Sequence, residues 1–142
     1  MPIDEQGLLE EARAAARFAE VPYSHFPVGA AVEADDGTIY RGCNVESAAY
    51  PLTLCAERVA IFSAIAHGNR PCRLAVTCPE GDLSDPNSFM QCGACRQVMM
   101  DQMGPDAEVF VDGVGAFTVG ELLPHGFRLP GSNAGRAKST VT

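Results

Sequence analysis

A chain of 142 residues, 46% of them hydrophobic, is long enough to form one domain around a single buried core. Its 18 acidic residues outnumber its 10 lysines and arginines, which gives a net charge of −8. A surface of this sign repels the phosphate backbone of a polynucleotide, and the sequence has no basic stripe that would offset the repulsion. The charge therefore argues against a polynucleotide partner and favours a small ligand with little or no charge.

The N-terminal segment has neither the basic start nor the apolar stretch of a secretory signal peptide. No apolar run approaches the roughly 18 residues that a membrane-spanning helix needs. We therefore expect a cytoplasmic protein without a membrane partner. Cytoplasmic thiols are kept reduced, so clustered cysteines among the six are expected to bind metal or carry redox chemistry, not to form a disulfide framework.

The first half of the chain predicts a helix, a β-hairpin and a second helix. Residues 5–19 have apolar side chains at the spacing of an amphipathic helix. Residues 27–33 and 38–45 have the composition of strands, and the Asp-Gly pair between them is typical of a hairpin turn. Residues 53–67 form the second predicted helix, with Thr53 as its N-cap, and apolar positions nearly surround it.

The second half predicts a strand over residues 73–78, a surface loop over 79–89 and a helix over 95–103. Two more strands are expected at 107–111 and 116–119. This order of elements predicts the α/β class, with a mixed sheet of about five strands inside a three-layer α/β/α sandwich.

We expect residues 1–130 to form a single catalytic domain, because no linker or internal repeat divides them. Residues 131–142 have almost no apolar side chains to bury and are expected to form a mobile tail.

Three cysteines differ from the others in their spacing: Cys55, Cys92 and Cys95. A Cys-x-x-Cys pair on one turn lets both sulfurs reach the same metal ion. A third thiolate from another segment would leave the fourth position of a tetrahedral zinc ion open, as catalytic zinc sites require. Both motifs begin predicted helices, where unpaired backbone N–H groups and the helix dipole stabilise thiolates. The pattern predicts one zinc ion per chain.

Glu57 and two arginines accompany these cysteines. Residues two apart face different sides of a helix, so Glu57 is poorly placed as a fourth ligand beside Cys55, but it can reach water and substrate. Zinc lowers the pKa of its water to about 7, and a neighbouring carboxylate can then carry the proton to a ring nitrogen. Arg58 and Arg96 could each draw negative charge from the sulfurs, and we favour Arg58 in this role.

Cys55-Ala-Glu57 followed by Cys92-x-x-Cys95 matches the pattern of zinc deaminases. Four segments also resemble the small cytidine deaminases that use three cysteines and form homotetramers; these are residues 23–32, 42–58, 92–98 and 122–127. In the family's order they cover nearly the whole predicted domain. The resemblance implies a cytidine deaminase-like fold and the hydrolysis of cytidine or deoxycytidine to uridine or deoxyuridine and ammonia, a step of pyrimidine salvage.

The resemblance also implies substrate contacts. Asn44 and Glu46 would bind the ribose hydroxyls, which amides and carboxylates can pair with, and Phe26 would lie against the pyrimidine ring. The backbone at Cys55 and Ala56 would hold the carbonyl of the base. From the residues alone, Asn44 and Glu46 can equally cap a turn, and Phe26 can equally belong to the core.

Members of this family complete each pocket with residues of neighbouring subunits. By this analogy Ala48, Tyr50 and Phe127 would line the pocket of a partner in the homotetramer. The chain departs from the family at Gln91, where proline is usual, and at Ser47, where asparagine is usual. Both departures spare the metal ligands, so they bear on substrate preference more than on chemistry.

Two alternatives remain open. One is a deaminase for a related aminopyrimidine, either a nucleotide or a nucleoside antibiotic of the blasticidin S type, although deaminases of that type lack the Asn44-x-Glu46 arrangement. The other is a structural zinc or redox module, because Cys-x-x-Cys alone is common to both. Such a module would have a closed metal site or a reversible Cys92–Cys95 disulfide, and it would hydrolyse no base.

Overall fold

The computed structural model describes residues 3–131, so the tail predicted beyond Gly131 lies outside the described residues. Five strands form one sheet in the order β2-β1-β3-β4-β5. Their bounds are β1 (Gly29–Ala34), β2 (Ile39–Cys43), β3 (Pro71–Thr77), β4 (Glu108–Val111) and β5 (Gly115–Thr118). Only β3 and β4 pair in parallel; the other neighbours are antiparallel, so the sheet is mixed as predicted.

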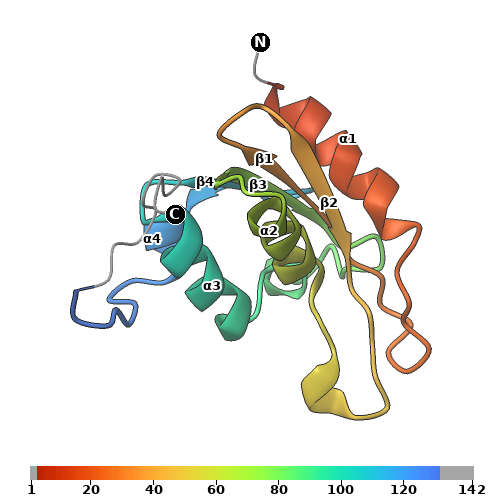
Figure 1. The fold of residues 1–142 in the computed structure, drawn as a ribbon. Coiled ribbons are helices and arrows are strands. Elements are labelled where there is room, and N and C mark those ends of the chain that lie inside the picture. The colour runs from red at the N-terminus through yellow and green to blue at the C-terminus, as the bar shows by residue number, and fades with distance from the viewer. Residues whose placement is uncertain (1–2, 132–142) are drawn as a thin grey trace.

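Helices cover both faces of this sheet (Figure 1). Their bounds are α1 (Glu5–Ala16), α2 (Ala56–Ala66), α3 (Gly93–Met103) and the short α4 (Val119–Leu122). Side chains of β1 alternate between the faces, with Ala31 packing under α1 and Val32 packing in the cluster that includes α2 and α3. The three-layer α/β/α prediction is therefore confirmed.

The direction of the strands determines where the helices begin. Both β2 and β3 run antiparallel to β1, so they point the same way. The helix α2 follows β2 and α3 follows β3. Both helices therefore start beyond the same end of the strands. This topology brings residue 55 and residues 92–95 together although 37 positions separate Cys55 from Cys92.

The two main helices begin at different residues from those predicted. Cys55 is the N-cap of α2, and Thr53 instead ends a short 3-10 helix, η1 (Tyr50–Leu52). The prediction of Thr53 as N-cap is wrong because its hydroxyl accepts the N–H of Ser47 and is not directed to the first turn of α2. Likewise α3 begins at Gly93, two residues before the predicted start, with Cys92 as its N-cap.

Two further expectations need correction. The helix α1 ends at Ala16, three residues early, because the chain then tightens into turns in which the N–H groups of Phe18 and Ala19 bond to carbonyls three residues back. The segment 79–89 is not only a surface loop. It contains a second 3-10 helix, η2 (Pro86–Phe89), whose Phe89 is buried in the core. Among the described residues, no helix is both long enough and apolar enough to cross a bilayer.

Gly42 allows β2 to pack directly against the backbone of α2. A Cβ atom at this position would lie 2.3 Å from the carbonyl oxygen of Ala56 and 2.5 Å from the nitrogen of Ala60. We expect Gly42→Ala to lower the free energy of unfolding by about 3 kcal/mol, the upper end of the usual overpacking cost, because backbone atoms cannot rotate away. Urea unfolding measures this loss.

The matched control is Arg41→Ala on the same strand. The Arg41 side chain is exposed and bonds to Glu11 on the other face, and such surface ion pairs contribute at most about 1 kcal/mol. Equal stability of Gly42→Ala and the parent protein would contradict the close approach of β2 and α2.

Candidate active site

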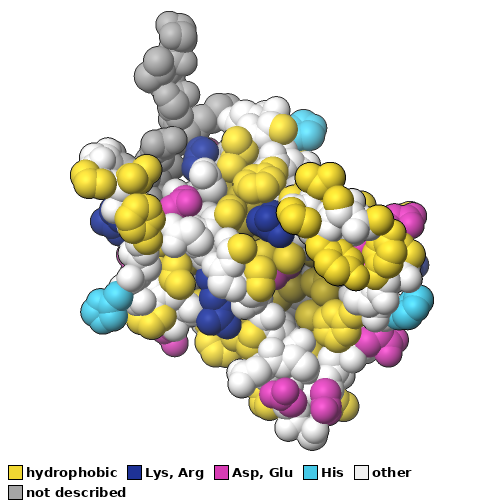
Figure 2. All heavy atoms as spheres, turned by 90° about the horizontal axis from the view of Figure 1, so that it is seen from below, with side chains coloured by type: hydrophobic (Ala, Val, Ile, Leu, Met, Phe, Trp, Pro, Cys, Tyr) yellow, Lys and Arg dark blue, Asp and Glu magenta, His cyan; other side chains and the backbone are white. Residues whose placement is uncertain are grey.

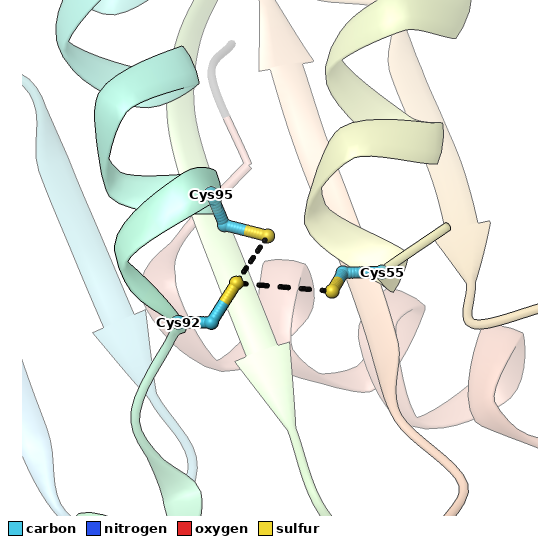
Figure 3. A group of neighbouring side chains, drawn as sticks. All are labelled: Cys55, Cys92 and Cys95. Atoms are coloured by element: carbon cyan, nitrogen blue, oxygen red, sulfur yellow. Dashed lines mark hydrogen bonds between the residues drawn. The ribbon is translucent and has the colours of Figure 1, made fainter. Parts of the chain in front are cut away.

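Three cysteine sulfurs meet where α2 and α3 begin (Figure 3). Cys55 and Cys92 are the N-caps of the two helices, and Cys95 lies one turn into α3. The Sγ atoms of Cys55 and Cys92 are 3.9 Å apart, those of Cys92 and Cys95 are 3.5 Å apart, and all three lie within 4.8 Å of one another. A tetrahedral zinc ion with Zn–S bonds of about 2.3 Å separates its sulfur ligands by about 3.8 Å, so this donor set fits zinc.

The cluster offers three ligands, one fewer than a closed zinc site. Within residues 3–131, no histidine or acidic side chain joins the three cysteines as a further possible metal ligand. Neither Cys55 nor Cys92 uses its side chain to cap its own helix, so both sulfurs face the cluster. A set of three thiolates with an open fourth position is the arrangement of catalytic sites, not of structural ones.

The electrostatics at Cys55 favour the thiolate. The hydrogen bond from the Cys95 thiol and the guanidinium of Arg58 lower the pKa of Cys55 to about 5. Arg58 Nη2 lies 3.5 Å from Cys55 Sγ and 3.4 Å from the carbonyl oxygen of Thr53. Arg96 points elsewhere, with Nη1 donating to the carbonyl of Leu122. Of the two arginines, Arg58 is therefore the one that contacts a sulfur.

The same hydrogen bond has the opposite effect on Cys95. That bond and burial raise the pKa of the Cys95 thiol, because the proton that Cys95 donates to the Cys55 thiolate is held in the bond. A zinc ion held by these cysteines would remove this competition, because a coordinated thiol is deprotonated.

Glu57 is a buried carboxyl group beside this cluster. Its side chain is 4% exposed and lies in the first turn of α2. Burial, and secondarily the neighbouring Cys55 thiolate, raises the pKa of Glu57 to about 7. A carboxyl group with a pKa in this range can both accept and release a proton near neutral pH, which is the property required of a general acid–base residue.

Cys55, Cys92 and Glu57 line a cavity of about 160 Å³, whereas Cys95 is fully buried and does not line it. Of the predicted site residues, Phe26, Asn44, Cys55, Ala56, Glu57 and Cys92 line it. The remaining wall comes from residues that sequence reasoning missed, namely Val28, Val76, Cys78, Ser88, Phe89 and Met90. Two of these residues come from β3 and the residue after it, and three come from η2 and the residue after it. The segment that the sequence predicts as a surface loop thus forms one side of the cavity.

A second hollow of about 350 Å³ lies alongside. Tyr23, Ser24, Glu46, Tyr50 and Thr53 line it. Three chain segments, residues 23–28, 44–46 and 50–57, each contribute residues to both hollows. The two hollows are therefore neighbours. Glu46 and Tyr50 face the second hollow, whereas Asn44 faces the first.

Asn44 and Glu46 hold the loop that carries Phe26. The Asn44 side chain accepts the N–H of Val28 and donates to the carbonyl of Phe26, both at 2.9 Å. Glu46 Oε1 accepts the N–H groups of Tyr23 and Ser24 at 3.0 and 3.1 Å. Hydrogen bonds from Ser24 and its neighbour lower the pKa of Glu46, so the carboxylate stays ionised. These two residues thus brace the loop, in addition to any contact with a ligand.

The residues predicted to serve a partner subunit lie on the surface. Ala48 is exposed, and Tyr50 and Phe127 are 73% and 65% exposed. Ala48 and Phe127 line neither hollow of their own chain. Gln97 of α3 donates to the carbonyl of Phe127 at 3.0 Å and so ties this segment to the helix that carries two of the cysteines.

Comparisons with known proteins agree with this geometry. Residues 2–111 match the family model described as the cytidine and deoxycytidylate deaminase zinc-binding region. A cytidine deaminase of Sporosarcina psychrophila is 44% identical over 130 residues, covering 88% of this chain and 92% of the relative. One from Halalkalibacterium halodurans is 42% identical over 129 residues, covering 88% and 95%.

A solved structure shows the same fold. The crystal structure of a cytidine deaminase from Burkholderia pseudomallei superposes with a TM-score of 0.79 at 41% identity, covering 88% of this chain and all of the other. The family model spans well over half of the chain, and two relatives exceed 40% identity over nearly their whole length. The chain therefore belongs to the family of cytidine and deoxycytidylate deaminases with a zinc-binding region.

Proposed function

We propose that this protein hydrolyses the 4-amino group of cytidine or deoxycytidine, consuming water and releasing ammonia and the uridine product. One observation carries the proposal, namely that two members of the three-sulfur cluster, Cys55 and Cys92, line the same cavity as the buried carboxyl group of Glu57. The activity named for its relatives agrees with this chemistry. We assign it to a single catalytic domain over residues 1–130.

In this proposal Cys55, Cys92 and Cys95 hold one zinc ion per chain. When bound, zinc supplies the Lewis acidity that makes a water molecule nucleophilic at neutral pH. Arg58 draws negative charge from Cys55, which keeps the three thiolates from cancelling that acidity.

Glu57 moves the protons of the reaction. Its carboxylate takes a proton from the attacking water and delivers one to N3 of the ring. A second proton then passes through Glu57 to the departing amine, which leaves as ammonia. Its burial at the head of the cavity keeps bulk water from competing for these transfers.

The two hollows suggest how a nucleoside is held. The smaller one accepts the base, with Phe26 along the ring and the free backbone N–H groups at the start of α2 near Ala56 for the base carbonyl. The larger one, with Glu46, accepts the sugar, while Asn44 lines the smaller one. No lysine, arginine or histidine within residues 3–131 lines either hollow. A phosphate group would meet Glu46 without a compensating cation, so we propose a nucleoside substrate over a nucleotide.

Ammonia release from four compounds tests the substrate. We expect cytidine and deoxycytidine to be turned over at least 100-fold more efficiently than CMP or blasticidin S, judged by kcat/KM. Without a matching cation, the 5′-phosphate of CMP must be brought beside an ionised carboxylate. A preference for CMP or for the antibiotic would overturn the substrate assignment while leaving the zinc chemistry intact.

Zinc content and thiol titration separate this proposal from a structural or redox module. The three-ligand cluster favours the catalytic interpretation. One zinc per chain together with turnover supports it. A metal-free form that cycles between a Cys92–Cys95 disulfide and two thiols, without hydrolysing any base, would support the redox module instead.

We propose that four copies assemble and complete one another's pockets. The segment that includes η1 exposes several large hydrophobic side chains, namely Val45, Tyr50, Leu52 and Leu54. Figure 2 shows that hydrophobic side chains gather on this end of the molecule. Exposed patches of this kind mark sites of protein association. Sedimentation equilibrium of the zinc-loaded protein tests the assembly, and a monomer at micromolar concentration would exclude it.

A cytoplasmic location and a role in pyrimidine salvage complete the proposal. Its support is that a reducing compartment would keep Cys55, Cys92 and Cys95 available as the thiolates that the proposed zinc site needs.

A further inference from the structure

Gln91 is a buried amide without a partner. Its side chain is 5% exposed, and neither Nε2 nor Oε1 has a hydrogen-bond partner in the described structure. An amide shielded from water in this way is costly unless something pairs with it. Because the side chain is already covered within its own chain, neither a substrate nor a second subunit can reach it. Its partner must therefore lie inside the subunit.

The backbone around Gln91 shows that its side chain points away from the cavity. Met90 and Cys92 both have extended backbones, with ψ of 159° and 164°, and both line the cavity. Side chains alternate between opposite sides along an extended chain. Gln91, between them, does not line the cavity, so its side chain is not directed toward the substrate.

Arg96 supplies the matching group. With Cys92 as N-cap, Gln91 occupies the position before the cap and Arg96 the fourth position of α3. Hydrophobic side chains at these two positions often pack against each other at helix starts, which shows that the two positions are within reach of each other. The Nε atom of Arg96 is also buried and without a partner, while Nη1 donates to the carbonyl of Leu122. A buried donor and a buried acceptor, each without a partner, thus stand at the two positions of one helix start that commonly meet.

We propose that one ordered water molecule links Gln91 Oε1 to Arg96 Nε, and that this link makes Gln91 a positioning residue for Cys92 and Cys95. The water accepts the N–H of the guanidinium and donates to the amide oxygen, so Arg96 Nε and Gln91 Oε1 each gain a partner. The link ties the residue before Cys92 to the residue after Cys95. It therefore holds the spacing of the two sulfurs from outside the metal site.

The inference rests on the zinc ligands of the proposed function, and zinc release to an excess of chelator tests it without measuring catalysis. Partners outside the ligand shell typically change metal affinity by 10- to 100-fold. We expect Gln91→Met, which keeps the volume but removes the acceptor, to release zinc about 10-fold faster than the parent. Arg96→Lys, which keeps the charge but removes Nε, should do the same. The double variant should also be about 10-fold faster, not 100-fold, because both changes break one link.

Two further variants sharpen the test. Gln91→Glu keeps an oxygen facing Arg96 and should release zinc within about threefold of the parent rate. Gln102→Met removes the side-chain oxygen that accepts from Arg70 near the other end of α3, so it reports what a loss of helix stability alone does, and it should release zinc at the parent rate.

The outcomes separate the two ideas. A parent protein that binds no zinc would refute the proposed function itself. A zinc-loaded parent whose Gln91→Met and Arg96→Lys variants release zinc at the parent rate would refute only the water link. Rates that multiply in the double variant, or equal acceleration by Gln102→Met, would refute it too. If Gln91→Met does not fold, Arg96→Lys and Gln91→Glu still decide the question, and a crystal structure of the loaded protein should show the water.

Discussion

Replacing Glu57 with glutamine should abolish most of the activity while leaving the metal in place. Glutamine has the same shape and fills the same buried space, but it cannot accept a proton from water or pass one to the substrate. General acid–base catalysis is typically worth 10²- to 10⁴-fold in rate, so we expect Glu57→Gln to lower kcat by about that factor or more. Because Glu57 serves the leaving group as well as the nucleophile, the upper end of this range is expected.

Zinc analysis and urea unfolding are the controls for this variant. Glu57 is not among the three clustered sulfurs, so the zinc content should stay at one per chain. Removing a carboxyl group that burial disfavours should leave the stability equal or slightly higher. Turnover within a few-fold of the parent would show that another group moves the protons. Loss of zinc together with activity would mean that Glu57 acts on the metal site instead.

The second large effect is expected at a single sulfur. Cys92→Ala removes one of three thiolates, and two remaining ligands cannot define a tetrahedral site. Partners outside the ligand shell alone change metal affinity by 10- to 100-fold, so the loss of a ligand should exceed about 100-fold. Zinc competition with a chelator measures this change. Deamination should fall below detection at zinc concentrations that saturate the parent.

Cys72→Ala is the matched control for Cys92→Ala. Both thiols are exposed in this structure, but Cys72 lies on β3 away from the cluster, where its sulfur bonds only to the carbonyl of Arg70. We expect Cys72→Ala to bind zinc and turn over substrate like the parent. If the two alanine variants behaved alike, the assignment of Cys92 as a ligand would be wrong.

The fold was predictable because local signals and topology agree. The Asp-Gly hairpin fixes β1 beside β2, and apolar runs mark β3 and the strands after it. The meeting of the three sulfurs could also be foreseen, since each motif stands at the start of a predicted helix and lends itself to binding a shared ion. The exact first residues of the helices were harder to predict. Thr53 is a residue type that often caps helices, and only the structure shows that its hydroxyl accepts the N–H of Ser47 instead.

Half of the cavity wall could not be foreseen. Residues 79–89 contain proline, glycine and aspartate at the density of an exposed loop, and this composition hid Phe89 and the residues beside it. Phe89, a lone aromatic residue at the end of this loop, is the one signal that could have been used. A large apolar side chain is usually buried, so its presence indicates that the end of the loop packs against the core. The bracing role of Asn44 was equally hidden, since its partners are backbone groups 16 and 18 positions away.

Cys55 and Cys92 begin their helices without directing a side-chain acceptor to the exposed amides of the first turn. An ordinary capping residue contributes about 1 kcal/mol at such a position, so both helix starts lack this stabilisation while the metal is missing. Once an ion ties the two sulfurs together, each start is fixed by the other. Zinc binding would thus also fix the local structure of both helix starts. A metal-free chain should fray first at the two turns where substrate would bind.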